Sequence, residues 1–194
     1  LVKDPVVHTF HGLAISILKS IGSQIGIAKD FKVWSNNKDR SLKIREFIKS
    51  DLKQQAIQIL TKEELDPYTI LEFIDNQREN LIDPEDASIK ASSKGSKKEI
   101  IYAEIYALYE SFLSTTNLLD FPRMVQKAVE ALEWDIERNG IFFKKFQHIL
   151  VDEYQDINFS QKILVDLFVS GGAELWVVGD DLQSIYGWRG SDIR

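Results

Sequence analysis

Cysteine is absent from the 194 residues of this chain. Without it there is neither a disulfide framework nor a zinc site built on thiolates. The sequence also lacks any apolar run near the roughly 20 residues that a membrane-spanning helix needs. No basic segment followed by an apolar one marks a secretory signal. We therefore expect a cytoplasmic protein with no membrane partner.

Basic charge is scarce as well. The chain holds 24 lysines and arginines against 30 acidic residues, for a net charge of −6. This excludes a protein coated in positive charge for wrapping nucleic acid, but it leaves room for binding through a local surface. Most of the excess acid lies within residues 150–194, where clustered carboxylates form either a solvated face or a place for a divalent cation.

The chain starts at Leu1 instead of a methionine and stops at Arg194, just after a glycine-rich turn. We interpret it as a piece of a larger protein. Most of it has helical periodicity with recognisable starts. The predicted helices cover residues 8–20, 39–61, 67 to before Pro84, 97–112 and a stretch from about 120 to 138. Residues 88–98 are polar and basic, which predicts a linker.

After Gly140 the pattern changes to short apolar runs at residues 148–151 and 175–178, each typical of a buried strand. Residues 160–168 between them have the pattern of a helix. A strand, a helix and a second strand in this order predict a parallel crossover unit. The sequence therefore predicts a mainly helical protein with a parallel α/β element at its C-terminal end.

Acidic residues follow both predicted strands: Asp152-Glu153 after the first, and Asp180-Asp181 after the second. Ligands of open parallel sheets bind at the carboxyl ends of the strands, so we expect these carboxylates at one rim. An aspartate there can hold the Mg²⁺ of a Mg-nucleotide, and a glutamate next to it can polarise the attacking water. The alternative is an ordinary solvated strand end.

Two aromatic residues, Tyr186 and Trp188, stand among glycines beside Arg189. They are either a loop tucked against the domain or a platform on which nucleic-acid bases stack. Gln183 lies between the acids and the aromatics, where it could sense phosphate on one side and a strand on the other.

These strings carry a family resemblance. DEYQD at 152–156 and VVGDDLQSIYGWRG at 177–190 resemble motifs II and III of superfamily 1 DNA helicases of the UvrD, Rep and PcrA type. HTFHGLA at 8–14 is similar to the TFHGLA motif of the same family, and 70–87 and 117–121 also have its character. The resemblance spans nearly all of the chain, in the right order.

The resemblance implies an α/β fold: a partial parallel-sheet P-loop NTPase (RecA-like) motor domain with a mainly α-helical inserted domain. Residues 1–22 would be the N-terminal part of motor domain 1A, and 23–115 the helical inserted domain 1B. Residues 116–194 would continue domain 1A with motifs II and III.

The resemblance also implies roles at an ATP site. Asp152 would bind Mg²⁺, Glu153 would be the catalytic base, and Gln183 would contact the γ-phosphate and couple it to DNA. Arg189 would lie near the acids or the strand. ATP and Mg²⁺ are thus the implied cofactors.

For DNA, the resemblance implies that Tyr186 and Trp188 stack on a single strand and that Thr9, Phe10 and His11 line the same track. The longer protein would be an ATP-dependent 3′–5′ DNA helicase acting on single-stranded DNA and on junctions with duplex.

Two features depart from the family pattern. Leu182 stands where an aspartate is common, and no G-x-x-x-x-G-K-[ST] phosphate loop occurs. We therefore expect this chain to be inactive by itself. The alternatives are a non-catalytic helicase relative that binds DNA or a protein, and a stand-alone Mg²⁺ phosphohydrolase, which nothing else in the sequence favours.

Overall fold

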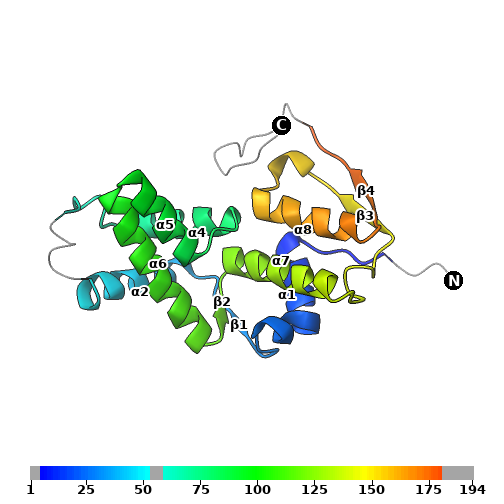
Figure 1. Cartoon of the computed structure of the whole chain (residues 1–194), viewed down its shortest axis with the longest axis horizontal. Coiled ribbons are helices and arrows are strands. Elements are labelled where there is room, and N and C mark those ends of the chain that lie inside the picture. The colour runs from blue at the N-terminus through cyan, green and yellow to red at the C-terminus, as the bar shows by residue number, and fades with distance from the viewer. Residues whose placement is uncertain (1–4, 53–58, 181–194) are drawn as a thin grey trace. The chain divides into compact units, whose positions relative to one another are not determined.

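The computed structural model describes residues 5–52 and 59–180, shown in Figure 1. The chain divides into two compact units. One, the split unit, comprises residues 1–30 and 123–194; the other, the continuous unit, comprises residues 31–122. The described residues form a mixed α/β structure that is rich in helix and has two small parallel sheets. Within them, no helix combines the length and apolar character needed to cross a membrane.

The continuous unit is built around the long helix α6. Helices α2, α4 and α5 pack on α6 or on one another, and strands β1 and β2 pair in parallel, Lys32 with Leu118 and Val33 with Leu119 (Figure 1). Its core is formed largely by apolar and aromatic side chains of these helices. The elements are β1 Lys32–Val33, α2 Asn37–Ser50, α4 Pro67–Glu79, α5 Pro84–Lys94, α6 Lys97–Thr115 and β2 Leu118–Leu119.

Side-chain caps decide where these helices begin. The carboxylate of Asp66 accepts the amides of Tyr68 and Thr69, and the hydroxyl of Ser96 accepts that of Glu99. Each cap satisfies backbone donors that have no partner within the first helical turn. The predicted starts of these two helices, at residues 67 and 97, are confirmed.

Two predictions for this unit were wrong: the end of one helix, and a linker that is in fact helical. The helix predicted over residues 39–61 ends at Ser50, as helix α2. Leu52 turns into the core, and its amide donates to the carbonyl of Phe47. Residues 53–58 of the predicted helix lie outside the described residues. The predicted linker at 88–98 is mostly helix α5. Its apolar face is made by Ala87 and Ala91, which are too small to give a strong hydrophobic pattern yet are fully buried.

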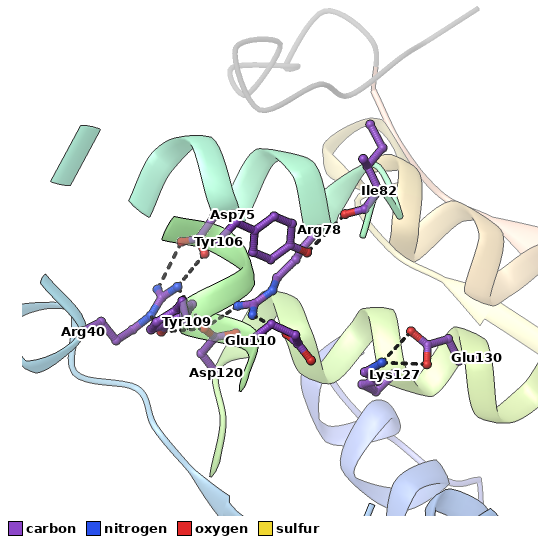
Figure 2. A network of polar contacts seen from close by, with 10 residues as sticks. All are labelled: Arg40, Asp75, Arg78, Ile82, Tyr106, Tyr109, Glu110, Asp120, Lys127 and Glu130. Carbon is purple, nitrogen blue, oxygen red and sulfur yellow. Dashed lines mark hydrogen bonds and ion pairs between the residues drawn. The ribbon is translucent and has the colours of Figure 1, made fainter. Parts of the chain in front are cut away.

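Charged side chains are buried inside the continuous unit, around Asp120 (Figure 2). The Oδ2 atom of Asp120 lies 2.7 Å from Nη1 of Arg78 and 3.0 Å from Nη2 of Arg40. It also accepts the hydroxyl of Tyr109 at 2.8 Å. Arg40 also pairs with Asp75, and Arg78 with Glu110 at 2.8 Å. We call Arg40, Asp75, Arg78, Tyr109, Glu110 and Asp120 the buried ion network.

The pKa shifts follow from this arrangement. Burial by itself lowers the pKa of Arg78, but Asp120, Glu110 and the neighbouring tyrosines together outweigh burial and raise the pKa above its ordinary value. Asp120 and Asp75, with Tyr109, do the same for the pKa of Arg40. Burial raises the pKa of Tyr109, and the charge of Asp120 raises it further. The arginines therefore stay cationic and Tyr109 stays a neutral donor, which compensates the buried carboxylate of Asp120.

The split unit contains the parallel crossover. Strands β3 and β4 pair in parallel from His148↔Glu174 to Val151↔Val177, with helix α8 between them in the chain. This confirms the crossover predicted from the two apolar runs. The elements are α1 Phe10–Ile21, the short 3-10 helix η1 Gly22–Ile25, α7 Phe121–Glu137, β3 His148–Val151, η2 Tyr154–Asp156, α8 Phe159–Ser170 and β4 Glu174–Val177.

The prediction that both strands are buried was wrong for most of their residues. Leu150 is 78% exposed and Trp176 is 60% exposed, whereas Val151 packs in a small cluster with Ile157 and with Val165 of α8. In the described part of the chain, side chains pack against one face of the two-stranded sheet, and the residues on its other face are exposed. The apolar run therefore identified the strands correctly but overstated their burial.

Candidate functional site

The ends of β3 and β4 are joined by backbone hydrogen bonds. The amide of Val178 donates to the carbonyl of Val151 at 2.9 Å, and the amide of Tyr154 donates to the carbonyl of Val178 at 3.0 Å. Asp152-Glu153 and Gly179-Asp180 therefore follow neighbouring strands at the same edge of the sheet. This is the rim expected from parallel pairing. We call it the acidic rim.

Asp152 and Glu153 are exposed, and within the described residues neither forms an ion pair with a lysine or arginine. The Oδ1 atom of Asp152 accepts the amide of Glu153 at 3.0 Å. Unlike the acids of the buried ion network, these two have no lysine or arginine partner among residues 5–52 and 59–180. Their carboxylates are therefore available to an external cation or to a reacting water.

Glu153 has a left-handed backbone conformation, with φ at 52° and ψ at 43°. For a residue with a Cβ this conformation costs roughly 1–2 kcal/mol. The turn it makes allows the next amide, that of Tyr154, to reach Val178 on the neighbouring strand. Backbone strain of this kind is concentrated at functional sites.

Gln155 connects the two halves of the acidic rim. Its side-chain Nε2 donates to Oε2 of Glu153, and its Oε1 accepts the amide of Asp180 at 3.1 Å. Gln155 is buried, at 8% exposure. Gln155 stands in the DEYQD string without a local signal of this role, because its contact with Asp180 depends on how the two strands pair.

Glycine at position 179 leaves room for the same contact. A Cβ at Gly179 would lie 2.5 Å from Oε1 of Gln155, and 3.3 Å from the backbone nitrogens of Gln155 and Tyr154. Any larger residue would push the Gln155 amide away from its two partners.

The acidic rim can supply a carboxylate ligand to a magnesium ion. Within the described residues, no group of three or more histidine, aspartate or glutamate side chains could hold a metal ion. Mg²⁺ is commonly bound through one or two carboxylates, with water and substrate phosphates completing its shell. Asp152, exposed at the end of β3, has the right chemistry for one such ligand.

The predicted DNA-track residues at the N-terminus lie on and just before α1. Thr9 is exposed and caps the helix, since its hydroxyl accepts the amide of Gly12 at 3.1 Å. Phe10 packs against the cluster of Val151, Ile157 and Val165 that supports the acidic rim. His11 is half-buried, and burial lowers its pKa. The structure thus brings Phe10 to the strand that ends in Asp152.

The remaining predicted site residues lie outside the described residues: Gln183, Tyr186, Trp188 and Arg189, together with Leu182, which departs from the family pattern.

Comparisons with known proteins identify the family. The family described as the UvrD/REP helicase N-terminal domain matches residues 1–194. The ATP-dependent DNA helicase PcrA of Leuconostoc citreum is 33% identical over all 194 residues, which are 24% of that protein. Proteins of the same name from Staphylococcus epidermidis and Staphylococcus aureus are 35% identical over 186 residues, 96% of this chain and 24% of each relative. The chain thus spans about a quarter of the length of these curated relatives, and it belongs to the family of UvrD/Rep helicase N-terminal domains.

Proposed function

We propose that this chain is the part of an ATP-dependent DNA helicase that supplies the hydrolytic carboxylates and a portion of the single-strand track. The observation that carries the proposal is the acidic rim: Asp152 and Glu153 are exposed together at the carboxyl end of a parallel strand, and neither pairs with a lysine or arginine of the described residues. Family membership supports it, since the relatives named above are ATP-dependent DNA helicases.

At the rim, Asp152 would hold the Mg²⁺ that accompanies ATP, and Glu153 would accept a proton from the attacking water. That water would displace ADP from the γ-phosphorus, and bound Mg²⁺ would neutralise charge on the phosphate oxygens. Gln183 would contact the γ-phosphate and signal its loss to the DNA track, with Arg189 near the same phosphates.

The two units correspond to parts of the proposed motor. We assign the split unit to a P-loop, RecA-like motor domain 1A and the helical continuous unit to the inserted domain 1B. The boundaries expected from the sequence, 1–22, 23–115 and 116–194, remain a prediction. The assignment is supported by a compact helical unit lying within the chain between the two segments of the split unit.

The DNA partner would be a single strand and its junction with duplex, with movement from 3′ to 5′. Tyr186 and Trp188 would stack on bases, and Thr9, Phe10 and His11 would lie along the same strand. Stacking contributes about 1–3 kcal/mol per base and tolerates any sequence, as a translocating motor requires.

The decisive test is ATP hydrolysis by the longer protein that contains this chain, with and without single-stranded DNA. We expect DNA to stimulate turnover, and Glu153→Gln to slow it by about 10²–10⁴-fold while ATP still binds, because a general base is lost. Glu174→Gln makes the same chemical change at the opposite end of the β3–β4 pair and should leave turnover unchanged.

A wild-type protein that binds DNA but does not turn over ATP would instead establish the non-catalytic alternative. The isolated chain lacks a phosphate-binding loop sequence and should show no steady hydrolysis. Sustained ATP turnover by the isolated chain would contradict the proposal that this chain supplies only part of the ATP site.

A further inference from the structure

We propose that Gln155 is a positioning residue that holds the carboxylate of Glu153 in the orientation needed to receive the proton of the attacking water. The inference rests on the proposed function, since it gives Glu153 the role of base. It adds a residue whose action is indirect: Gln155 touches Glu153 and the backbone of Asp180.

The two contacts of Gln155 use both ends of one amide group, and chemistry determines which end faces which partner. A backbone N–H can only donate, so the side-chain oxygen must face Asp180. The carboxylate of Glu153 can only accept, so the side-chain nitrogen must face Glu153. The amide therefore has one orientation that satisfies both partners, and it links the end of β3 to the end of β4.

This link restrains a side chain that is otherwise exposed. A glutamate in solvent samples several rotamers, and holding it in one of them costs conformational entropy. A general base must lie within about 2.6–3.2 Å of the proton donor, and a misplacement of about 1 Å can cost about 100-fold in rate. Gln155 is buried and held by the amide of Asp180, which follows β4, so it supplies that restraint before the substrate arrives.

Two substitutions disturb the hydrogen bonds of Gln155 in different ways. Gln155→Glu keeps the chain length and an oxygen for the Asp180 amide, but it replaces the donor to Glu153 with a repelling carboxylate. Gly179→Ala leaves Gln155 and Glu153 chemically intact, while its Cβ occupies the space of the Gln155 side-chain oxygen. Gln147→Glu is the matched control, because it makes the same charge change next to the opposite end of β3.

The experiment measures kcat and KM for ATP in the longer, DNA-stimulated protein. We expect Gln155→Glu to lower kcat by about 10–100-fold and Gly179→Ala to lower it by about 10-fold, both with KM for ATP nearly unchanged. Gln155→Glu should also lower the thermal midpoint, because it places a second carboxylate at a buried position beside Glu153. Gln147→Glu should behave as wild type. A purely structural role would not separate kcat from KM, whatever the change in thermal midpoint.

The double variant Glu153→Gln/Gln155→Glu provides the sharpest readout. If Gln155 acts through Glu153, the double variant is as slow as Glu153→Gln alone, because the restrained base has already been removed. Losses that multiply, or a Gln155→Glu protein with wild-type kcat, would overturn the positioning role while leaving the helicase assignment intact. Failure of Glu153→Gln itself to slow hydrolysis would overturn the proposed function and this inference with it.

Discussion

The two units use aspartate and glutamate in opposite ways. In the continuous unit, Asp120 is 1% exposed and receives hydrogen bonds or ion pairs from Arg40, Arg78 and Tyr109 (Figure 2). In the split unit, Asp152 and Glu153 are exposed, with no cationic partner in the described part of the chain. A carboxylate that folding removes from water needs such partners, because its desolvation costs several kcal/mol. A carboxylate left in water avoids that cost and remains available to a ligand. Burial and partners, not residue type, separate the neutralised structural acids from the acids that remain accessible to a ligand.

The largest expected effect comes from breaking the buried ion network. Asp120→Ala would leave two arginines buried without their shared carboxylate, and we expect it to lower the free energy of unfolding by about 3–5 kcal/mol. Urea unfolding of the chain measures this change. Asp152→Ala is the matched control at the acidic rim and should change the same quantity by no more than about 0.5 kcal/mol. Equal losses from both variants would remove the distinction between the two regions.

A smaller effect is expected from the strained backbone at Glu153. Glu153→Ala and Glu153→Gly remove the same carboxylate, but only glycine adopts the left-handed conformation without steric cost. We expect the glycine variant to be more stable than the alanine variant by about 0.5–1 kcal/mol, as measured by thermal unfolding. Both should be inactive in the longer protein. An alanine variant at least as stable as the glycine variant would show that no strain is stored at the acidic rim.

The smallest effect is expected for an ion pair near the surface. Lys127 and Glu130 lie one turn apart on α7, with their charged atoms 2.8 Å apart (Figure 2), and both remain partly in contact with solvent. Lys127→Ala should change the free energy of unfolding by no more than about 0.5 kcal/mol, because solvent screens the pair. The loss for Asp120→Ala should shrink little in 1 M salt, whereas the contribution of Lys127 should vanish there. A large and salt-insensitive loss for Lys127→Ala would contradict the comparison.

Much of the split unit could be predicted because its signals are local. The apolar run ending at Val151, the acids after it and the glycines before β4 are read directly along the chain, and they identified the crossover and the rim. The capping residues Thr9, Asp66 and Ser96 were equally readable, since a cap acts within one helical turn.

The features that the sequence did not predict correctly depend on contacts between segments that are distant in the chain. Arg40 and Arg78 look like ordinary polar helix positions in the sequence, yet they are buried because Asp75, Glu110 and Asp120 come from other segments to neutralise them. Helix α5 was read as a linker because two buried alanines give almost no hydrophobic signal. Burial of Leu150 and Trp176 was overestimated because an apolar run does not reveal how many faces of a sheet are covered.

By itself, the sequence determined most of the local elements of this protein: the longer helices, the two strands of the crossover, and the fact that Asp152 and Glu153 follow a strand. These features depend on neighbours within a few residues. Only the tertiary structure decided that Asp120 is neutralised in a core while Asp152 faces water, and that Gln155 reaches both Glu153 and Asp180. Hydrogen bonding and desolvation depend on which distant atoms lie within a few ångströms, and that distance is set by packing.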